Sequence, residues 1–227
     1  MDELRVIPVS GIPEIVGGDD VAAEIVDHTP IPLADGDILV VTQKVVSKSE
    51  GRLVPAAERT AAVGEESVRV LRRSNGMTIS ETTHGFVCAN AGVDASNVPG
   101  GHIALLPADP DASARRIRSR VQHLAGVDVA VIISDTFGRA WRLGQTDVAI
   151  GVAGIEPFVD HRGAFDSEGR ELTATRICSA DELAGAAELV MGKVERVCAA
   201  LIRGASVTRG RGRATEIVRP VADDLFR

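Results

Sequence analysis

Two short runs of branched apolar residues constrain the fold of this chain most strongly. Residues 38–42 read Ile-Leu-Val-Val-Thr, and residues 129–133 read Val-Ala-Val-Ile-Ile. Runs that are apolar at successive positions, instead of at every second one, are typical of buried interior strands. The second run gives way to Ser134-Asp135-Thr136, where we expect a turn.

The other elements mix strands and helices without regular alternation. Further strands are expected at residues 4–9, 77–81, 85–89, 148–152, 172–178 and 196–202. Helices are expected from Asp19 or Asp20 to His28, and over residues 57–73, 111–124 and 179–192, the last begun by a capping box of Ser179 and Glu182. This order favours an α+β fold with mixed sheets and flanking helices.

Composition favours a globular, cytoplasmic protein. The 227 residues suffice for one domain or two interleaved subdomains, and neither a membrane-spanning run nor a signal peptide at residues 1–5 is expected. A net charge of −7 and an aromatic content of 3% disfavour binding to nucleic acid or to anionic membranes. A local group of arginines can still bind an anionic small molecule.

The cysteines indicate neither a disulfide scaffold nor a zinc site. Cys88, Cys178 and Cys198 are far apart in the sequence, and no pair is spaced as C-x-x-C. Each stands among apolar residues, so we expect three buried thiols.

Asp94 and Asn97 lie in a loop of small residues, Asn-Ala-Gly-Val-Asp-Ala-Ser-Asn at 90–97. Asp and Asn are common in turns because they bond to their own backbone, and on its own this loop is best interpreted as such a turn. It would equally suit a hard cation, with Asp94 as an oxygen ligand.

The segment after the second apolar run is the stronger candidate for a site. Asp135 and Thr136 offer oxygens at the end of a strand, which suits Mg²⁺ or Mn²⁺. Arg139 and Arg142 would share one face if the segment turned helically, and would then clamp a phosphate or carboxylate. Alternatively, Asp135 caps a helix and the arginines are a solvated surface.

Two further segments suggest contacts with phosphate. Gln43, Lys44 and Lys48 lie in residues 42–51, although neither a Walker A nor a G-x-G-x-x-G motif is present, and a solvated charge run is the simpler interpretation. The tail at 203–220 alternates Gly and Arg, which fits either a polyphosphate-binding loop or a mobile surface loop.

Taken together, these segments resemble the coenzyme F420-0:L-glutamate ligase family, in its single-domain form. The resemblance rests on Gly-Ile-Pro-Glu-Ile at 11–15, Asp-Gly-Asp at 35–37, Ala-Gly-Val-Asp-Ala-Ser-Asn at 91–97 and Ser-Asp-Thr-x-Gly-Arg-x-x-Arg at 134–142. Residues 179–193 and the Arg-Gly at 203–204 continue the match, which covers nearly the whole chain.

The resemblance implies a GTP-dependent ligase that adds L-glutamate to F420-0, or to its dehydro form, during coenzyme F420 biosynthesis. It also implies Mn²⁺ or Mg²⁺, two per site, with K⁺ as activator, and an intertwined homodimer. The family's nucleotide contacts would fall on Ile12, Pro13, Glu14, Ile15, Gln43, Lys48 and Asn97. Its metal ligands would fall on Asp94, Asp135 and Thr136.

Amide formation requires an activated carboxylate, here an acyl phosphate made with GTP, and we expect Arg139 and Arg142 to hold that group or a substrate carboxylate. Compared with many relatives, we expect a shorter segment between residues 54 and 77, and arginines stand at 209, 211 and 213 where many relatives are acidic. We also expect no fused flavin-reductase-like domain of the kind that some relatives carry. The alternatives are a metal-dependent phosphohydrolase or nuclease and a non-catalytic nucleotide-binding module.

Overall fold

The computed structural model describes residues 3–225. Met1 and Asp2, which belong to the stretch considered for a signal peptide, lie outside the described residues.

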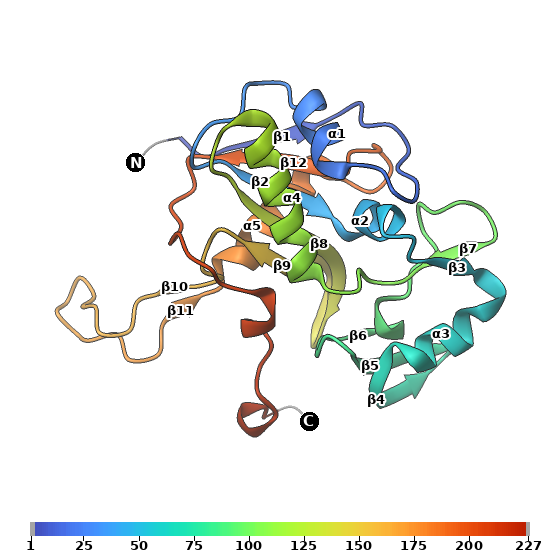
Figure 1. Ribbon diagram of the computed structural model, residues 1–227. Coiled ribbons are helices and arrows are strands. Elements are labelled where there is room, and N and C mark those ends of the chain that lie inside the picture. Colours follow the sequence, from blue (N-terminus) through green and yellow to red (C-terminus); the bar gives the residue numbers. More distant parts are fainter. Residues whose placement is uncertain (1–2, 226–227) are drawn as a thin grey trace.

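A mixed five-stranded sheet forms the centre of the molecule (Figure 1). Its strands, in spatial order, are β1 (Arg5–Val9), β12 (Ala199–Arg203), β2 (Ile38–Thr42), β8 (Ala130–Arg139) and β9 (Arg142–Ala153). Only the β2–β8 pairing is parallel; the other pairings within this sheet are antiparallel. The predicted α+β fold with mixed sheets is confirmed.

Helices cover both faces of this sheet, which explains the fully apolar strands. Helices α1 (Val21–His28) and α4 (Pro110–Ala125) pack on one face, where Leu39 and Val41 point, and α5 (Ser179–Met191) packs on the other, where Ile38 and Val40 point. Figure 1 shows α4 in front of the sheet and α5 behind it. The short helix α2 (Gln43–Ser49) follows β2 directly.

A smaller β unit lies beside α2. It contains β3 (Leu53–Pro55), β4 (Ser67–Ser74), β5 (Met77–Thr82), β6 (Val87–Ala89) and β7 (His102–Ala104), with short 3-10 turns at Ala56–Glu58 and Asn90–Gly92. The helix predicted over residues 57–73 is confirmed only for α3 (Arg59–Glu65); its second half is wrong, because β4 begins at Ser67. The Ser67 hydroxyl donates to the Val63 carbonyl at the helix end, and the following residues pair with β5.

The long strand predicted at residues 172–178 is also largely wrong. Only Arg176–Ile177 forms a strand, β11, which pairs with β10 (Val159–Asp160) at the base of an extended excursion (Figure 1). Two 3-10 turns, Ala214–Glu216 and Val221–Asp223, complete the tail.

The helix ends test the capping predictions. Asp20 caps α1, accepting a hydrogen bond from Ala23 N, as predicted. The capping box at Ser179 is wrong, because Cys178 occupies the cap position without a side-chain bond. α5 ends at Gly192 as expected.

The three cysteines are free thiols, of which Cys88 is buried while Cys178 and Cys198 are half-buried. Burial raises the pKa of Cys88 and Cys178 to about 12 and that of Cys198 to about 11, so all three are poor nucleophiles. Within residues 3–225, no helix has both the length and the apolar character needed to cross a membrane.

Candidate active site

Three strands that run in the same direction reach one edge of the central sheet, where β1 and β2 end and β8 continues into a hairpin. The register places Val9 of β1, Val41 of β2 and Ile133 of β8 in one row, with Ala199 of the antiparallel β12 between the first two. The loop after β1, helix α2 after β2 and the continuation of β8 all lie beyond this row. Open sheets commonly bind ligands at such an edge, so the segments assigned to nucleotide and metal meet where a site is expected.

Strand β8 does not end in a turn at Ser134, as the sequence suggested, but runs on to Arg139 in a hairpin with β9. Its register shifts between Ile133 and Ser134, and such bulges re-aim side chains beside active sites. Because successive side chains of a strand point to opposite faces, Asp135 faces away from Ser134 and Thr136.

Asp147 of β9 is a site residue that the sequence reasoning missed. It lies opposite Thr136 in the hairpin and is only 3% exposed. Its Oδ1 accepts a 2.6 Å bond from Thr136 Oγ1, and its Oδ2 accepts a 2.8 Å bond from Ser134 Oγ. The only signal in the sequence was a lone Asp just before the strand expected at residues 148–152, and it becomes informative once the hairpin register is known.

Lys193, just after α5, connects two parts of the site. Its ammonium contacts Thr136 Oγ1 and lies 3.8 Å from Asp147 Oδ1. Its backbone carbonyl accepts a 3.2 Å bond from Asn97 Nδ2. The loop that carries Asn97 is thereby tied to the β8–β9 hairpin.

Asp94 lies in the same loop and pairs with Lys44 of α2. Lys44 Nζ is 2.7 Å from Asp94 Oδ2, and Ser96 donates to Asp94 from both its backbone and its hydroxyl. Burial raises the pKa of Asp94, but the bonds from Lys44 and Ser96 outweigh it, so the pKa lies below its usual range. Asp94 is therefore an anion at neutral pH.

Among the carboxylates of the site, Asp135 has the most strongly shifted pKa. Burial raises its pKa to about 7, and the negative charges of Asp147 and Asp94 add to the rise, while Lys44 opposes it. The negative charges of Asp94, Asp135 and Asp147 therefore influence one another, and Lys44 offsets them only in part. A half-buried carboxylate with such a shifted pKa is typical of a functional site.

The residues predicted to bind nucleotide form the neighbouring part of this edge. Ile12, Pro13 and Glu14 lie in the loop after β1, and Ile15 anchors it in the core. The Lys48 ammonium, almost completely buried, forms an ion pair with Glu14. Lys48 and Glu14, both expected from the family resemblance to contact nucleotide, therefore contact each other in the structure.

Gln43, at the start of α2, is 1% exposed. Its Oε1 accepts a bond from the Ser47 hydroxyl, whereas its Nε2 has no hydrogen-bond partner among the described residues. A buried donor without an acceptor is unfavourable, so this amide is suited to bond a ligand oxygen.

The helical clamp expected from Arg139 and Arg142 is wrong. They are the facing residues that close the β8–β9 hairpin, and both are exposed. Arg139 Nη2 donates to the Leu143 carbonyl at 3.2 Å, and the Leu143 side chain is 99% exposed. The two guanidinium groups therefore lie at a projecting tip.

The arginine-rich tail lies at the opposite edge of the sheet. Arg209 forms a bridge with Ile155, and its guanidinium donates to the carbonyl of Asp128, which precedes β8. The backbone amides of Arg211 and Arg213 bond to glutamates of the chain. Within one chain, the tail is thus remote from Asp135.

The oxygen donors at the site suit a hard cation, although they do not form a closed cage. Among residues 3–225, no group of three or more His, Cys, Asp or Glu side chains is arranged to hold a metal ion. Mg²⁺ and Mn²⁺ often use one or two carboxylates and complete their coordination with water and phosphate oxygens. Asp94 and Asp135 fit this chemistry, and a cation bound beside Asp135 would stabilise the charged carboxylate that burial, and to a smaller extent Asp147 and Asp94, disfavour.

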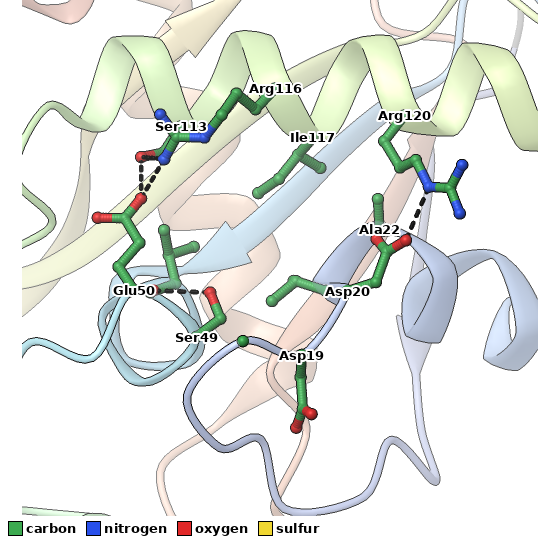
Figure 2. A pocket seen from close by; sticks show the side chains of 12 residues that line it. Asp19, Asp20, Ala22, Ser49, Glu50, Ser113, Arg116, Ile117 and Arg120 are labelled. Atoms are coloured by element: carbon green, nitrogen blue, oxygen red, sulfur yellow. Dashed lines mark hydrogen bonds and ion pairs between the residues drawn. The ribbon is translucent and has the colours of Figure 1, made fainter.

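A separate pocket of about 260 Å³ lies between α1, α2 and α4. Figure 2 shows Asp20 pointing to Arg120, and Glu50 pointing to Ser113 and Arg116. These charges compensate one another, and none of the predicted site residues lines this pocket. The chemistry therefore favours the sheet edge.

Comparisons with known proteins identify the family to which the chain is similar. The family model described as F420-0:Gamma-glutamyl ligase matches residues 11–63 and 56–204, which include both sides of the site. A coenzyme F420:L-glutamate ligase from Methanothermobacter thermautotrophicus is 42% identical over 249 residues, covering 99% of both chains. Relatives with the same name from Methanocaldococcus jannaschii and Methanopyrus kandleri are 38% and 40% identical over 248 residues, covering 99% of this chain and 98% of theirs.

Proposed function

The chain belongs to the F420-0:gamma-glutamyl ligase family, an enzyme family, and we propose that it joins L-glutamate to coenzyme F420-0, or its dehydro form, using GTP. The observation that carries this proposal is the meeting of Asp94, Asp135 and Asp147 with Lys44 and Lys193 at one sheet edge. Such an edge offers both carboxylates for cations and ammonium groups for phosphates.

The reaction requires two steps: transfer of the γ-phosphoryl group to the acceptor carboxylate, and then transfer of the acyl group to the glutamate amine. The carboxylate oxygen of the acceptor attacks the γ-phosphorus of GTP, the bond from that phosphorus to the β-γ bridging oxygen breaks, and GDP leaves. The glutamate amine then attacks the acyl carbon, phosphate leaves with the bond electrons, and the amine loses a proton to give the amide. Both steps develop negative charge that fixed cationic groups stabilise.

The nucleotide would lie along the loop of residues 12–15 and α2. Lys48 is placed to add a point charge on phosphate by exchanging Glu14 for the ligand. The unpartnered Nε2 of Gln43 would donate to a nucleotide oxygen, and Asn97 would contact the nucleotide from the facing loop. GTP as the nucleotide is supported by the family resemblance alone.

Asp94 and Asp135 would hold Mg²⁺ or Mn²⁺, and Thr136, on the other face of the strand, would contact a second ion. Such ions neutralise the triphosphate and the charge that develops on it. K⁺ as an activator is supported only by the resemblance.

The tip of the β8–β9 hairpin would take part in the proposed homodimer and would carry the two arginines proposed to hold a substrate carboxylate. Arg139 and Arg142 lie beside exposed Leu143, a large apolar side chain that a second copy of the chain would cover. An intertwined dimer would carry these guanidinium groups to a neighbouring chain, where they would hold a substrate carboxylate.

A reaction with GTP, Mn²⁺, F420-0 and L-glutamate, followed by mass spectrometry and phosphate release, tests the proposal. We expect one GDP and one phosphate for each glutamate added, and no product with Asp135→Asn. Phosphate release that does not depend on glutamate would instead support the phosphohydrolase alternative. An Asp27→Asn variant, changed on the exposed face of α1, is the matched control.

A further inference from the structure

The buried Asp147 carboxylate fixes the direction of the hydrogen bonds around Thr136. Lys193 Nζ contacts Thr136 Oγ1, and an ammonium group can only donate. The Thr136 oxygen therefore accepts from Lys193, and its own proton goes to Asp147 Oδ1, 2.6 Å away. Thr136 is thus held as an acceptor toward a cationic group.

The other carboxylate oxygen of Asp147, Oδ2, bonds to Ser134, which can be compared with Thr136. Oδ2 accepts a 2.8 Å hydrogen bond from Ser134 Oγ, but Ser134 is completely buried, and among the described residues its hydroxyl pairs with Asp147 and not with Lys193 or Asp94. Both hydroxyl groups therefore satisfy the same carboxylate, but only the Thr136 hydroxyl also contacts the ammonium of Lys193.

The charge of Asp147 is only weakly compensated by the chain. Lys193 lies 3.8 Å from Oδ1, and half of its side chain is exposed to solvent, which screens the pair. The hydrogen bonds from Ser134 and Thr136 stabilise this buried carboxylate, and a cation that approached Thr136 would stabilise it further.

We propose that Asp147 is a positioning residue that takes the proton of the Thr136 hydroxyl, so that the Thr136 oxygen is presented as an acceptor to a divalent cation. The presence of that cation rests on the proposed function. Lys193 marks the direction in which the oxygen offers its lone pair. Partners that orient metal ligands in this way commonly contribute about 10-fold to 100-fold to metal affinity.

Mn²⁺ titration tests this inference without measuring catalysis. Each folded variant is saturated with a non-hydrolysable GTP analogue, and free Mn²⁺ is followed by electron paramagnetic resonance. We expect Asp147→Asn and Thr136→Val each to weaken one Mn²⁺ site about 10-fold or more. Thr136→Ser, which keeps the hydroxyl, should restore binding, and Ser134→Ala should stay within about twofold of the parent protein, since its hydroxyl does not face the cation.

The double variant of Asp147→Asn with Thr136→Val should bind Mn²⁺ no more weakly than the weaker single variant, because both changes remove one interaction. Additive losses, or unchanged affinity in Asp147→Asn, would overturn the inference. If Asp147→Asn does not fold, the comparison of Ser134→Ala with Thr136→Val decides. An equal loss of Mn²⁺ affinity in these two variants would overturn the inference. Absence of Mn²⁺ binding in the parent would overturn the proposed metal site as well, whereas absence of glutamylation alone would leave this inference standing.

Discussion

Replacing Asp135 with asparagine should stabilise the metal-free protein while abolishing ligase activity. Burial raises the pKa of Asp135 to about 7 from its ordinary value of 3.8, and the charges of Asp147 and Asp94 add to the rise. Between these values the folded protein binds a proton that the unfolded chain has released. The contribution of Asp135 to stability is therefore complete below about pH 4 and is lost as the pH rises toward 7.

The size of this effect follows from the shift. A pKa unit corresponds to about 1.4 kcal/mol, so the charged Asp135 side chain costs on the order of 4 kcal/mol at about pH 8. An amide keeps one oxygen acceptor and has no charge to desolvate. Asp135→Asn should therefore raise the free energy of unfolding by a few kcal/mol at about pH 8, and by much less at about pH 5.

Urea unfolding of the protein in EDTA, at about pH 5 and pH 8, measures this difference. Asp27→Asn makes the same chemical change on the exposed face of α1 and should alter stability by no more than about 0.5 kcal/mol at either pH. A variant at Asp135 that is no more stable than the parent at about pH 8 would refute the idea that function keeps an unfavourable carboxylate at this position.

Three other substitutions test separate parts of the structure. Lys48→Met should weaken binding of a GTP analogue about 10-fold or more, measured by calorimetry, and unchanged affinity would exclude Lys48 from the nucleotide site. Gly151→Ala places a Cβ 2.4 Å from the Pro110 carbonyl oxygen, so we expect a loss of about 1–3 kcal/mol in urea unfolding, and a neutral result would contradict the close approach of α4 to β9. Arg203→Ala should cost about 3–5 kcal/mol, because it leaves the buried Asp37 without its bidentate partner, and full rescue by Arg203→Lys would argue against that geometry.

Local patterns in the sequence were sufficient for much of the fold. The apolar run of β2 requires cover on both faces whatever its neighbours, and the Asp20 cap and the Gly192 end depend on bonds within a few residues. Residues 67–73 were misassigned as helix because their strand is defined by pairing with β5, a non-local contact that composition does not reveal.

The site was predictable in part for the same reason. Asp135 was recognisable as a carboxylate following a buried strand, and Asp94 as an oxygen donor in a loop, although only the structure brings both within range of Lys44. Asp147 could not be found, because its role depends on the hairpin register that sets it opposite Thr136. The residues between two strands do not show whether they turn helically or continue as a hairpin, and this is why the helical arrangement expected for Arg139 and Arg142 was wrong.

The central claim is that this sheet edge couples the cleavage of GTP to amide formation through an acyl phosphate. Transfer of an oxygen isotope tests it most directly. F420-0 labelled with ¹⁸O in the reacting carboxylate is incubated with GTP, Mn²⁺ and L-glutamate, and the phosphate is examined by mass spectrometry. We predict that one ¹⁸O atom passes to the phosphate for each glutamate added, because the carboxylate oxygen that attacks the γ-phosphorus leaves with it. Phosphate that carries oxygen from water, and none from F420-0, would contradict this account.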